Sequence, residues 1–197
     1  MGLSIYYSGR IKNADSLPLL VEEIKDISKI YGWKYCTYET CFPNNTLAEK
    51  ESFQKIYGIH FTPTNCETVC IAFLSNGVMV NPHGVEFFAE STNELNRYCI
   101  YNNFVKTQYA GVFIHQLIIN LFKYLNDKYF EQFKMDDESH YWETGDENIM
   151  REKFQEYDAL LDNFILSVET FPAKKGETMT AYFERLLGHV NNLKDRK

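Results

Sequence analysis

The sequence lacks the short motifs by which several large enzyme classes are recognised. Its ten glycines are scattered, and none falls in a GxxxxGK[ST], GxGxxG or GxSxG pattern. Those patterns build phosphate-binding loops and the nucleophile-bearing turn of many hydrolases. No stretch approaches the ~20 consecutive apolar residues that a membrane-spanning helix needs. We therefore expect neither a nucleotide-dependent enzyme of a familiar type nor contact with a membrane.

An excess of positive charge is also absent. The chain has 20 Lys and Arg against 27 Asp and Glu, a net charge of −7. Nucleic-acid binding depends on clustered Lys and Arg that displace counterions from phosphates, so we expect no nucleic-acid partner. The N-terminal MGLSIYYSGR has no basic stretch followed by a long apolar one, unlike a signal peptide. We expect a cytoplasmic protein, and a basic partner if it binds another macromolecule.

Cysteine is present, but not in a pattern that binds metal or forms a disulfide framework. The sequence contains five cysteines, which is an odd number. Cys66 and Cys70 would lie about 13 Å apart in an extended segment, too far to share one zinc ion. No His follows Cys36 and Cys41 at zinc-finger spacing. We expect reduced thiols, no bound metal and no cofactor.

Apolar and aromatic residues, by contrast, are abundant. Hydrophobic residues make up 45% of the chain, with 14 Tyr and 15 Phe, which favours a sizeable folded core. Near the N-terminus, β-forming residues at 3–8, a helical period over 15–31 and a second extended stretch at 33–39 predict a β-α-β unit. Gly32 ends the predicted helix.

The middle of the chain predicts an antiparallel hairpin. Apolar stretches at 67–75 and 78–81 flank Asn76-Gly77, the dipeptide that suits a two-residue type I′ turn. GIHFTP (58–63) and RYCIYNNF (97–104) are further strand candidates, bounded by turn-forming residues.

Helical periodicity dominates after residue 110. Apolar residues recur at three- and four-residue steps over 112–130, 146–169 and 178–193. Strands before this point and helices after it predict an α+β fold, with the N-terminal β-α-β unit, a largely antiparallel sheet and C-terminal helices. The stripe on the second of these helices is Met150, Phe154, Tyr157, Leu161, Phe164 and Val168.

The length of 197 residues suits one domain. The chain is either a single domain over 1–197, or an α+β core over 1–135 with a helical hairpin over 144–197 packed on it. The hairpin either packs on the sheet or exchanges with a second copy, so a homodimer through the C-terminal helices is one of the open alternatives.

Two histidines are candidate site residues. His115 lies on the apolar face of its predicted helix with Ile118 and Ile119. A histidine on such a face is more often a core residue hydrogen-bonded to a neighbour than a ligand. His83 lies in the turn NPHGVE with Glu86, just after the predicted hairpin, where loops often carry function. A solvated loop histidine is the plainer interpretation.

The most unusual stretch is DDESHYWETGDE, residues 136–147, with six carboxylates, one histidine and no Lys or Arg. If its first half is extended, four side chains point to one side: Asp136, Glu138, His140 and Trp142. The carboxylates of Asp136 and Glu138 would then lie close enough to raise one pKa, or would bind a cation together with ligands from another part of the fold. Glu143 follows directly after this set. The half from 136 to 143 is a solvated acidic edge, a protein-binding surface, or an acid–base or metal site.

The second half of that stretch has a structural explanation. TGDE, Thr144 to Glu147, fits the capping-box pattern, in which the Thr hydroxyl and the Glu carboxylate each accept from a backbone N–H at the helix start. Acidic side chains are also favourable near the positive end of a helix dipole. These acids need no functional role.

Five stretches together resemble a group of uncharacterised bacterial proteins. They are GLSIYYSGR, GWKY, FTPTNCETV, VKTQYAG and YWETGDE, of which the last is the most specific. The resemblance covers residues 2 to about 160. It implies a bacterial protein, but no activity, cofactor or catalytic residue.

Two functional hypotheses follow. The first is a small binding or regulatory protein that engages a basic protein partner through the acidic aromatic segment, since aromatic anchors suit an interface. The second is a metal-dependent or acid–base enzyme of unfamiliar type that uses Glu138, His140 and Glu143. The fold would have to bring His83 or His115 to these side chains. Whether the protein is an enzyme stays open.

Overall fold

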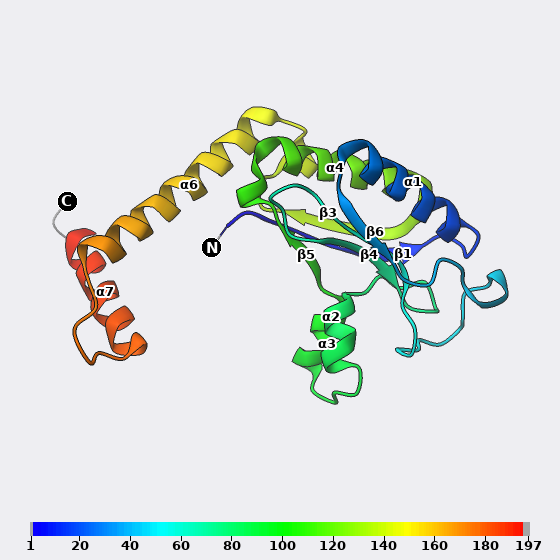
Figure 1. The fold of residues 1–197 in the computed structure, drawn as a ribbon, viewed down its shortest axis with the longest axis horizontal. Helices are drawn as coiled ribbons and strands as arrows, with labels where there is room; N and C mark the ends of the chain where they lie inside the picture. The colour runs from blue at the N-terminus through cyan, green and yellow to red at the C-terminus, as the bar shows by residue number, and fades with distance from the viewer. Residues whose placement is uncertain (1, 195–197) are drawn as a thin grey trace. The chain divides into compact units, whose positions relative to one another are not determined.

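The computed structural model describes residues 2–194 and divides the chain into two compact units, Gly2–Phe154 and Gln155–Lys197 (Figure 1). The fold class is α+β, as the sequence predicts. The strands of the larger unit are β1 (Ser4–Ile11), β2 (Lys34–Thr37), β3 (Tyr57–Thr62), β4 (Val69–Phe73), β5 (Asn103–Lys106) and β6 (Phe130–Asp137). Its helices are α1 (Ser16–Tyr31), α2 (Pro82–Phe88), α3 (Glu94–Tyr101), α4 (Gly111–Tyr129) and α5 (Tyr141–Thr144), with short 3₁₀ turns at Pro43–Asn45 and Gln108–Ala110.

Helix α6 (Glu147–Thr170) begins in the larger unit and continues into the smaller one, which also holds α7 (Met179–Lys194). The helices predicted over 15–31, 112–130, 146–169 and 178–193 are confirmed to within one residue at each end. No described helix is long and apolar enough to cross a membrane.

The strands form two three-stranded antiparallel sheets. One has the order β5-β1-β6 and the other β2-β3-β4. In the first, Tyr6 of β1 stands opposite Phe104 of β5 and Asp136 of β6. In the second, His60 of β3 stands opposite Cys70 of β4. The predicted β-α-β order is present, but β1 and β2 lie in different sheets, so they do not pair with each other.

A short segment, residues 77–80, joins the two sheets. On one side Val80 N donates to Ala72 O of β4 (2.8 Å), and on the other Met79 N donates to Gly9 O of β1 (2.9 Å). Strand β6 pairs with one edge of β1. The other edge pairs first with β5, along Ser4–Tyr7, and then with this segment, at Gly9 and Ile11. The sheet therefore forks at this edge, with β4 on one branch and β5 on the other.

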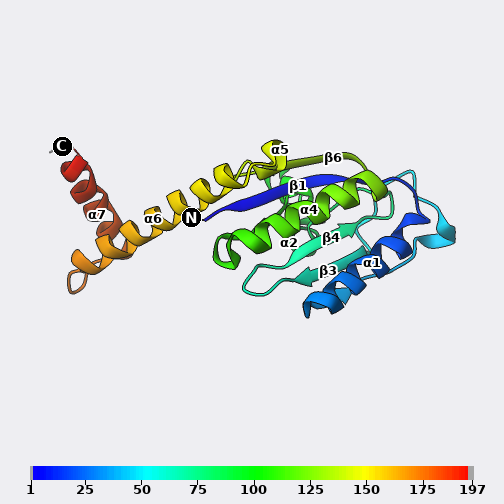
Figure 2. The ribbon, with the colours of Figure 1, turned by 90° about the horizontal axis from the view of Figure 1, so that it is seen from above.

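Helices α1 and α4 lie side by side over one face of the sheets (Figures 1 and 2). Helix α1 packs on β2 and β3, and α4 packs on β6. The Phe122 ring of α4 lies 4.6 Å from the Tyr7 ring of β1, which shows that Tyr7 points toward the helices. The predicted apolar face of α4 is buried in full: His115, Ile118, Ile119, Phe122, Leu125 and Tyr129.

The stretch RYCIYNNF does not form one strand, contrary to the sequence prediction. Residues 97–101 belong to α3, and β5 begins only at Asn103. The Asn93 side chain caps α3 by accepting from a backbone N–H of its first turn (2.9 Å). Helix α2 also approaches α3 closely at Gly84, where an added Cβ would lie 2.3 Å from Cys99 O. The cap and this packing outweigh the β-propensity of the stretch.

The hairpin after β4 is confirmed, but its turn is not type I′. Gly77 N donates to Leu74 O (2.8 Å), so Ser75 and Asn76 form the corner. Only Gly77 of the Asn76-Gly77 pair has a positive φ, 82°, whereas a type I′ turn needs two such residues. The loop has three residues, and a left-handed glycine follows the corner.

The capping box predicted for TGDE is not formed. Asp146, rather than Thr144, caps α6, since its Oδ1 accepts from Asn148 N (2.8 Å). Thr144 Oγ1 accepts from Asp146 N (3.1 Å). Glu147 does not reach back to Thr144, because its Oε1 accepts from Gln116 Nε2 of α4 (2.7 Å). The Glu side chain therefore docks α6 on α4.

In the smaller unit, α7 is held by the connector that precedes it. Arg185 donates to Glu177 (2.8 Å) and to Pro172 O (3.0 Å), and its guanidinium lies 4.1 Å from the centre of the Phe171 ring. Among the described side chains of this unit, two are buried: Tyr182 and Leu186.

Candidate functional site

The side chains of the acidic segment (136–143) do not share one environment. Asp136 is exposed on the face of the β5-β1-β6 sheet opposite α4, because it pairs with Tyr6 rather than with the inward-pointing Tyr7. His140 and Glu143 are also exposed. Glu138 is half-buried, and its Oε2 accepts from the first backbone N–H of β1 (2.7 Å). A basic partner would meet Asp136, His140 and Glu143, but not the whole predicted set.

Trp142 is packed against its own fold. Its ring meets the Phe133 ring edge-on at 5.7 Å. Lys123 Nζ of α4 lies 5.8 Å from the centre of the Trp142 ring and 5.2 Å from that of Tyr141. An ammonium near aromatic rings is itself a favourable contact. The aromatic pair therefore already has a cation, which weakens the case for it as the anchor of a basic partner.

Beside this segment, the interior holds a polar cluster of Thr107, His115, Asp137 and Ser139, none of which has exposed surface. His115 Nδ1 lies 2.7 Å from Thr107 Oγ1. Its Nε2 lies 2.8 Å from Ser139 Oγ and 3.0 Å from Asp137 Oδ1. Ser139 Oγ in turn donates to Asp137 Oδ2 (2.8 Å). We call this set the buried polar cluster.

Asp137 is the ionised member of the buried polar cluster. Burial alone would raise the pKa of the Asp137 carboxyl. The hydrogen bond and the electrostatic interaction with His115 lower it, as do the hydrogen bonds from the backbone N–H groups of Ser139 and Trp142. The resulting pKa is about 2. Trp142 N donates to Asp137 Oδ2 at 3.0 Å, and Ser139 N to Oδ1 at 2.9 Å. The carboxylate thus holds the turn that leads from β6 into α5.

The buried polar cluster contains Ser, His and Asp but does not have the geometry of a nucleophilic triad. In a triad, the base contacts the nucleophile through one ring nitrogen and the acid through the other. Here Ser139 and Asp137 both lie at Nε2 of His115, and Thr107 lies at Nδ1. Because none of the four has exposed surface, a substrate cannot reach the hydroxyl. The cluster ties β6, α4 and the turn after β5 together.

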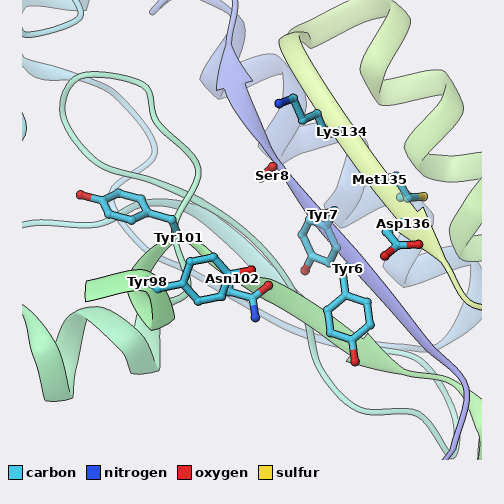
Figure 3. Close-up of a pocket in the computed structure, with 9 residues that line it drawn as sticks. All are labelled: Tyr6, Tyr7, Ser8, Tyr98, Tyr101, Asn102, Lys134, Met135 and Asp136. Atoms are coloured by element: carbon cyan, nitrogen blue, oxygen red, sulfur yellow. The ribbon is translucent and has the colours of Figure 1, made fainter. Parts of the chain in front are cut away.

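A groove of about 540 Å³ crosses the outer face of the β5-β1-β6 sheet. Figure 3 shows Tyr6 and Ser8 of β1 beside Lys134 and Asp136 of β6, with Tyr98 of α3 and Asn102 on the other side of the groove. Asp136 is the one predicted site residue in this outer-face groove. None of the buried polar atoms that lack a partner in the described part of the chain lies in its wall.

A second cavity, of about 610 Å³, lies where the sheet forks, and we call it the fork cavity. Its walls include His60 of β3, Cys70 of β4, Tyr7 of β1, Asn103 of β5 and His83 of α2. Tyr7 bridges the fork, since its hydroxyl donates to Cys70 O (2.8 Å) and accepts from Cys70 N (3.1 Å). The fork thus brings together side chains from five separate elements.

Several titratable groups of the fork cavity are held uncharged at neutral pH. Burial raises the pKa of Tyr38 to about 12 and that of the Cys70 thiol to about 11, and it raises the pKa of Tyr7 well above its ordinary value. Burial and the nearby His83 lower the pKa of His60, whose Nδ1 lies 2.9 Å from Tyr38 Oη. Glu67 is the carboxylate of the wall, and its Oε2 accepts from Lys106 N (2.9 Å), whereas these Tyr, Cys and His side chains offer hydrogen bonds without charge.

Asn103 is the polar side chain of the fork cavity wall that lacks partners. It is 1% exposed, and neither its Oδ1 nor its Nδ2 has a hydrogen bond within residues 2–194. A buried polar group without a hydrogen bond costs about 1–3 kcal/mol, and such groups are rare in folded proteins. Pairing with Tyr7 across the sheet fixes Asn103 at this position. Asn103 is thus the residue of the fork cavity wall whose buried polar atoms lack a partner in the described part of the chain.

The predicted site residues do not converge. His83 lines the fork cavity, Asp136 lines the outer-face groove, and His115 lies in the interior. Of the two candidate histidines, His115 contacts the acidic segment, through the buried side chains of Asp137 and Ser139, and His83 lies at the fork cavity. Among the described residues, no group of three or more His, Cys, Asp or Glu side chains could hold a metal ion. All five cysteines are free thiols.

The comparisons with known proteins give no match: no family model, curated protein or solved structure corresponds to the chain. The resemblance of YWETGDE and the four other stretches to uncharacterised bacterial proteins therefore stays a prediction. In the structure YWETGDE forms α5 and the start of α6.

Proposed function

We propose that this protein binds a small, planar, uncharged molecule in the fork cavity. The observation that carries the proposal is the buried Asn103 amide, whose donor and acceptor both lack partners within the described residues. An amide offers a donor and an acceptor side by side. It pairs with molecules that carry the complementary arrangement, such as the edge of adenine or a carboxamide. A ligand that makes both hydrogen bonds removes the cost of the unsatisfied amide.

The size and charge of the cavity restrict the ligand class. A volume of about 610 Å³ falls in the range of small-molecule sites. No Lys or Arg is among the described residues that line it, whereas phosphate recognition relies on such cations. Tyr38 and the Cys70 thiol are neutral near pH 7, and burial lowers the pKa of His60, which favours its neutral form. An uncharged ligand is therefore favoured over a phosphorylated one.

Phe104 also belongs to the cavity wall, and its ring is 48% exposed and lies 6.1 Å from the Tyr6 ring. Because Phe104 pairs with Tyr6 and Asn103 pairs with Tyr7, the Phe104 ring and the Asn103 amide point to opposite faces of β5. A planar ligand is therefore favoured by the hydrogen-bonding edge that the amide requires, and not by stacking beside the amide.

The proposal is tested by calorimetric titration of uncharged heteroaromatic amines and amides, with adenine and nicotinamide as the first probes. We expect saturable binding of at least one of them, and at least tenfold weaker binding of adenosine monophosphate than of adenine. Asn103→Leu should abolish binding. Asn102→Leu is the matched control, because the neighbouring Asn102 lines the outer-face groove, and it should leave binding unchanged.

Asn103→Leu also separates a binding role from a structural one. If the amide has no partner in the free protein, an apolar side chain of similar size should raise the free energy of unfolding by about 1 kcal/mol. Urea unfolding of both variants measures this change. A less stable Asn103→Leu protein, or no binding of any uncharged probe to the parent protein, would contradict the proposal.

A further inference from the structure

Two exposed apolar rows of equal length lie on the smaller unit. Each row has three large side chains at four-residue steps, which places them in one ridge along the helix surface. Each row spans nine residues of helix, and the eight steps from its first to its last residue cover about 12 Å. All six side chains are between 37% and 65% exposed. The rows are Leu160, Phe164 and Val168 on α6 and Met179, Phe183 and Leu187 on α7.

The smaller unit does not cover these rows with its own described side chains. Its buried residues are Tyr182 and Leu186, and Arg185 holds α7 to the connector. Short helices are marginal in water unless an apolar face is covered, and units of this size usually need a metal, a disulfide or a second subunit. A cluster of exposed large apolar side chains is typical of an interaction surface.

The charged residues near the two rows indicate which row packs against which. Residues 155–170 contain four acidic residues and no Lys or Arg, whereas residues 171–194 contain four basic residues and two acidic ones. Two copies of this part of α6 would bring like charges together, whereas it attracts Lys174 and Lys175 of the connector before α7; Arg185 is already paired with Glu177. The two rows match in length, and the segments that carry them differ in the sign of their charge. Within one chain both rows stay exposed, so the complement comes from another copy.

We propose that two copies of this chain associate through their smaller units, with the α7 row of each copy packed against the α6 row of the other. The contact uses the same two rows of each copy, so it is self-complementary and closes as a dimer. The sequence leaves a homodimer through the C-terminal helices as an alternative, and this arrangement specifies which helix faces would form it. It rests on the helical rows alone and does not depend on ligand binding in the fork cavity.

Sedimentation velocity of the full chain at micromolar concentration tests the dimer. We expect the parent protein to sediment as a dimer, and Phe164→Glu and Phe183→Glu each to sediment as a monomer, because a carboxylate would be buried in the contact. The matched control is Ile30→Glu, at a 78% exposed apolar residue of α1, which should stay dimeric. Circular dichroism checks that the overall helix and strand content of the variants equals that of the parent protein. A monomeric parent protein, or a dimer that survives both substitutions, would overturn the proposal.

Mixed cross-linking tests the pairing of the rows. Phe164→Cys and Phe183→Cys proteins are prepared separately, mixed and mildly oxidised, with the parent protein and its own free thiols as background. We expect the disulfide-linked dimer to form mainly in the mixture. Preferential linkage of Phe164→Cys to itself would show α6 against α6 and would overturn the pairing of α6 with α7.

Discussion

His115 Nε2 lies 3.0 Å from Asp137 Oδ1, and neither residue has exposed surface. The pair joins the second turn of α4 to the last residue of β6, and it accounts for one of the six acids of DDESHYWETGDE. Glu138, Asp146 and Glu147 are accounted for by their contacts with β1, with the first turn of α6 and with α4. The chemistry that stands out in the sequence is thus largely structural, while the unsatisfied amide lies elsewhere, at Asn103.

Replacing His115 tests how much the buried pair contributes to stability. His115→Ala leaves Asp137 buried without its side-chain partner on α4, and removing one partner of a buried pair costs about 3–5 kcal/mol. We expect a loss of that size in the free energy of unfolding, measured by urea denaturation followed by tryptophan fluorescence. Glu143→Ala is the matched control, since Glu143 is exposed in the same segment and lies in helix α5, and it should change stability by less than about 0.5 kcal/mol. Equal losses in the two variants would show that the buried polar cluster does not stabilise the fold.

The depressed pKa of Asp137 predicts a specific acid sensitivity. The folded-state pKa of about 2 lies below the ordinary value of 3.8, so the carboxylate contributes stability above pH 4 that is lost as the pH falls toward 2. The full contribution is about 2 kcal/mol, of which about 1 kcal/mol is lost by pH 3. The gap in unfolding free energy between the parent protein and Asp137→Asn should narrow by that amount between pH 6 and pH 3. Asp136→Asn keeps Asp137 and should keep the acid sensitivity of the parent protein.

The helices illustrate what the sequence can predict. The apolar face of α4 follows a period of 3.6 residues, and every predicted member of it is buried, including His115. The end of α1 was predictable because Gly32 has the left-handed backbone, φ 66°, that a helix C-cap requires. In both cases the information is local, since it lies within a few turns of one helix.

Two elements show where local information fails. The RYCIYNNF stretch has β-forming residues, but the fit of Gly84 against Cys99 packs its first part as α3. Strand β6 has no counterpart in the predicted elements. Its pairing with β1 shifts register between Ser8 and Arg10, and Gln132 has a positive φ of 52°, so a regular alternation of buried and exposed residues is interrupted. Both outcomes depend on segments far away in the chain.

The fork cavity could not be predicted, for the same reason. Its wall combines residues from 7 to 104, and the amide of Asn103 is notable only because β5 pairs with β1 and places it opposite Tyr7. In the sequence, Asn103 is one of two adjacent asparagines at the end of a presumed strand. His83 was singled out as a loop histidine, and its place in the cavity wall is the part of this site that the sequence indicated.

The Tyr7 hydroxyl should stabilise the fork of the sheet. Tyr7→Phe removes the oxygen that donates to Cys70 O and accepts from Cys70 N, and it leaves both backbone groups facing the fork without that partner. We expect the free energy of unfolding to fall by about 1–3 kcal/mol. Tyr6→Phe is the matched control: Tyr6 precedes it on the opposite face of β1, and its hydroxyl has no hydrogen bond within the described residues, so stability should change little. Hydrogen exchange should report the loss locally, with faster exchange of the Cys70 amide in Tyr7→Phe than in Tyr6→Phe. If Cys70 exchanges equally fast in both variants, the hydroxyl does not close the fork, and the cavity beside it is open to water between β4 and β5.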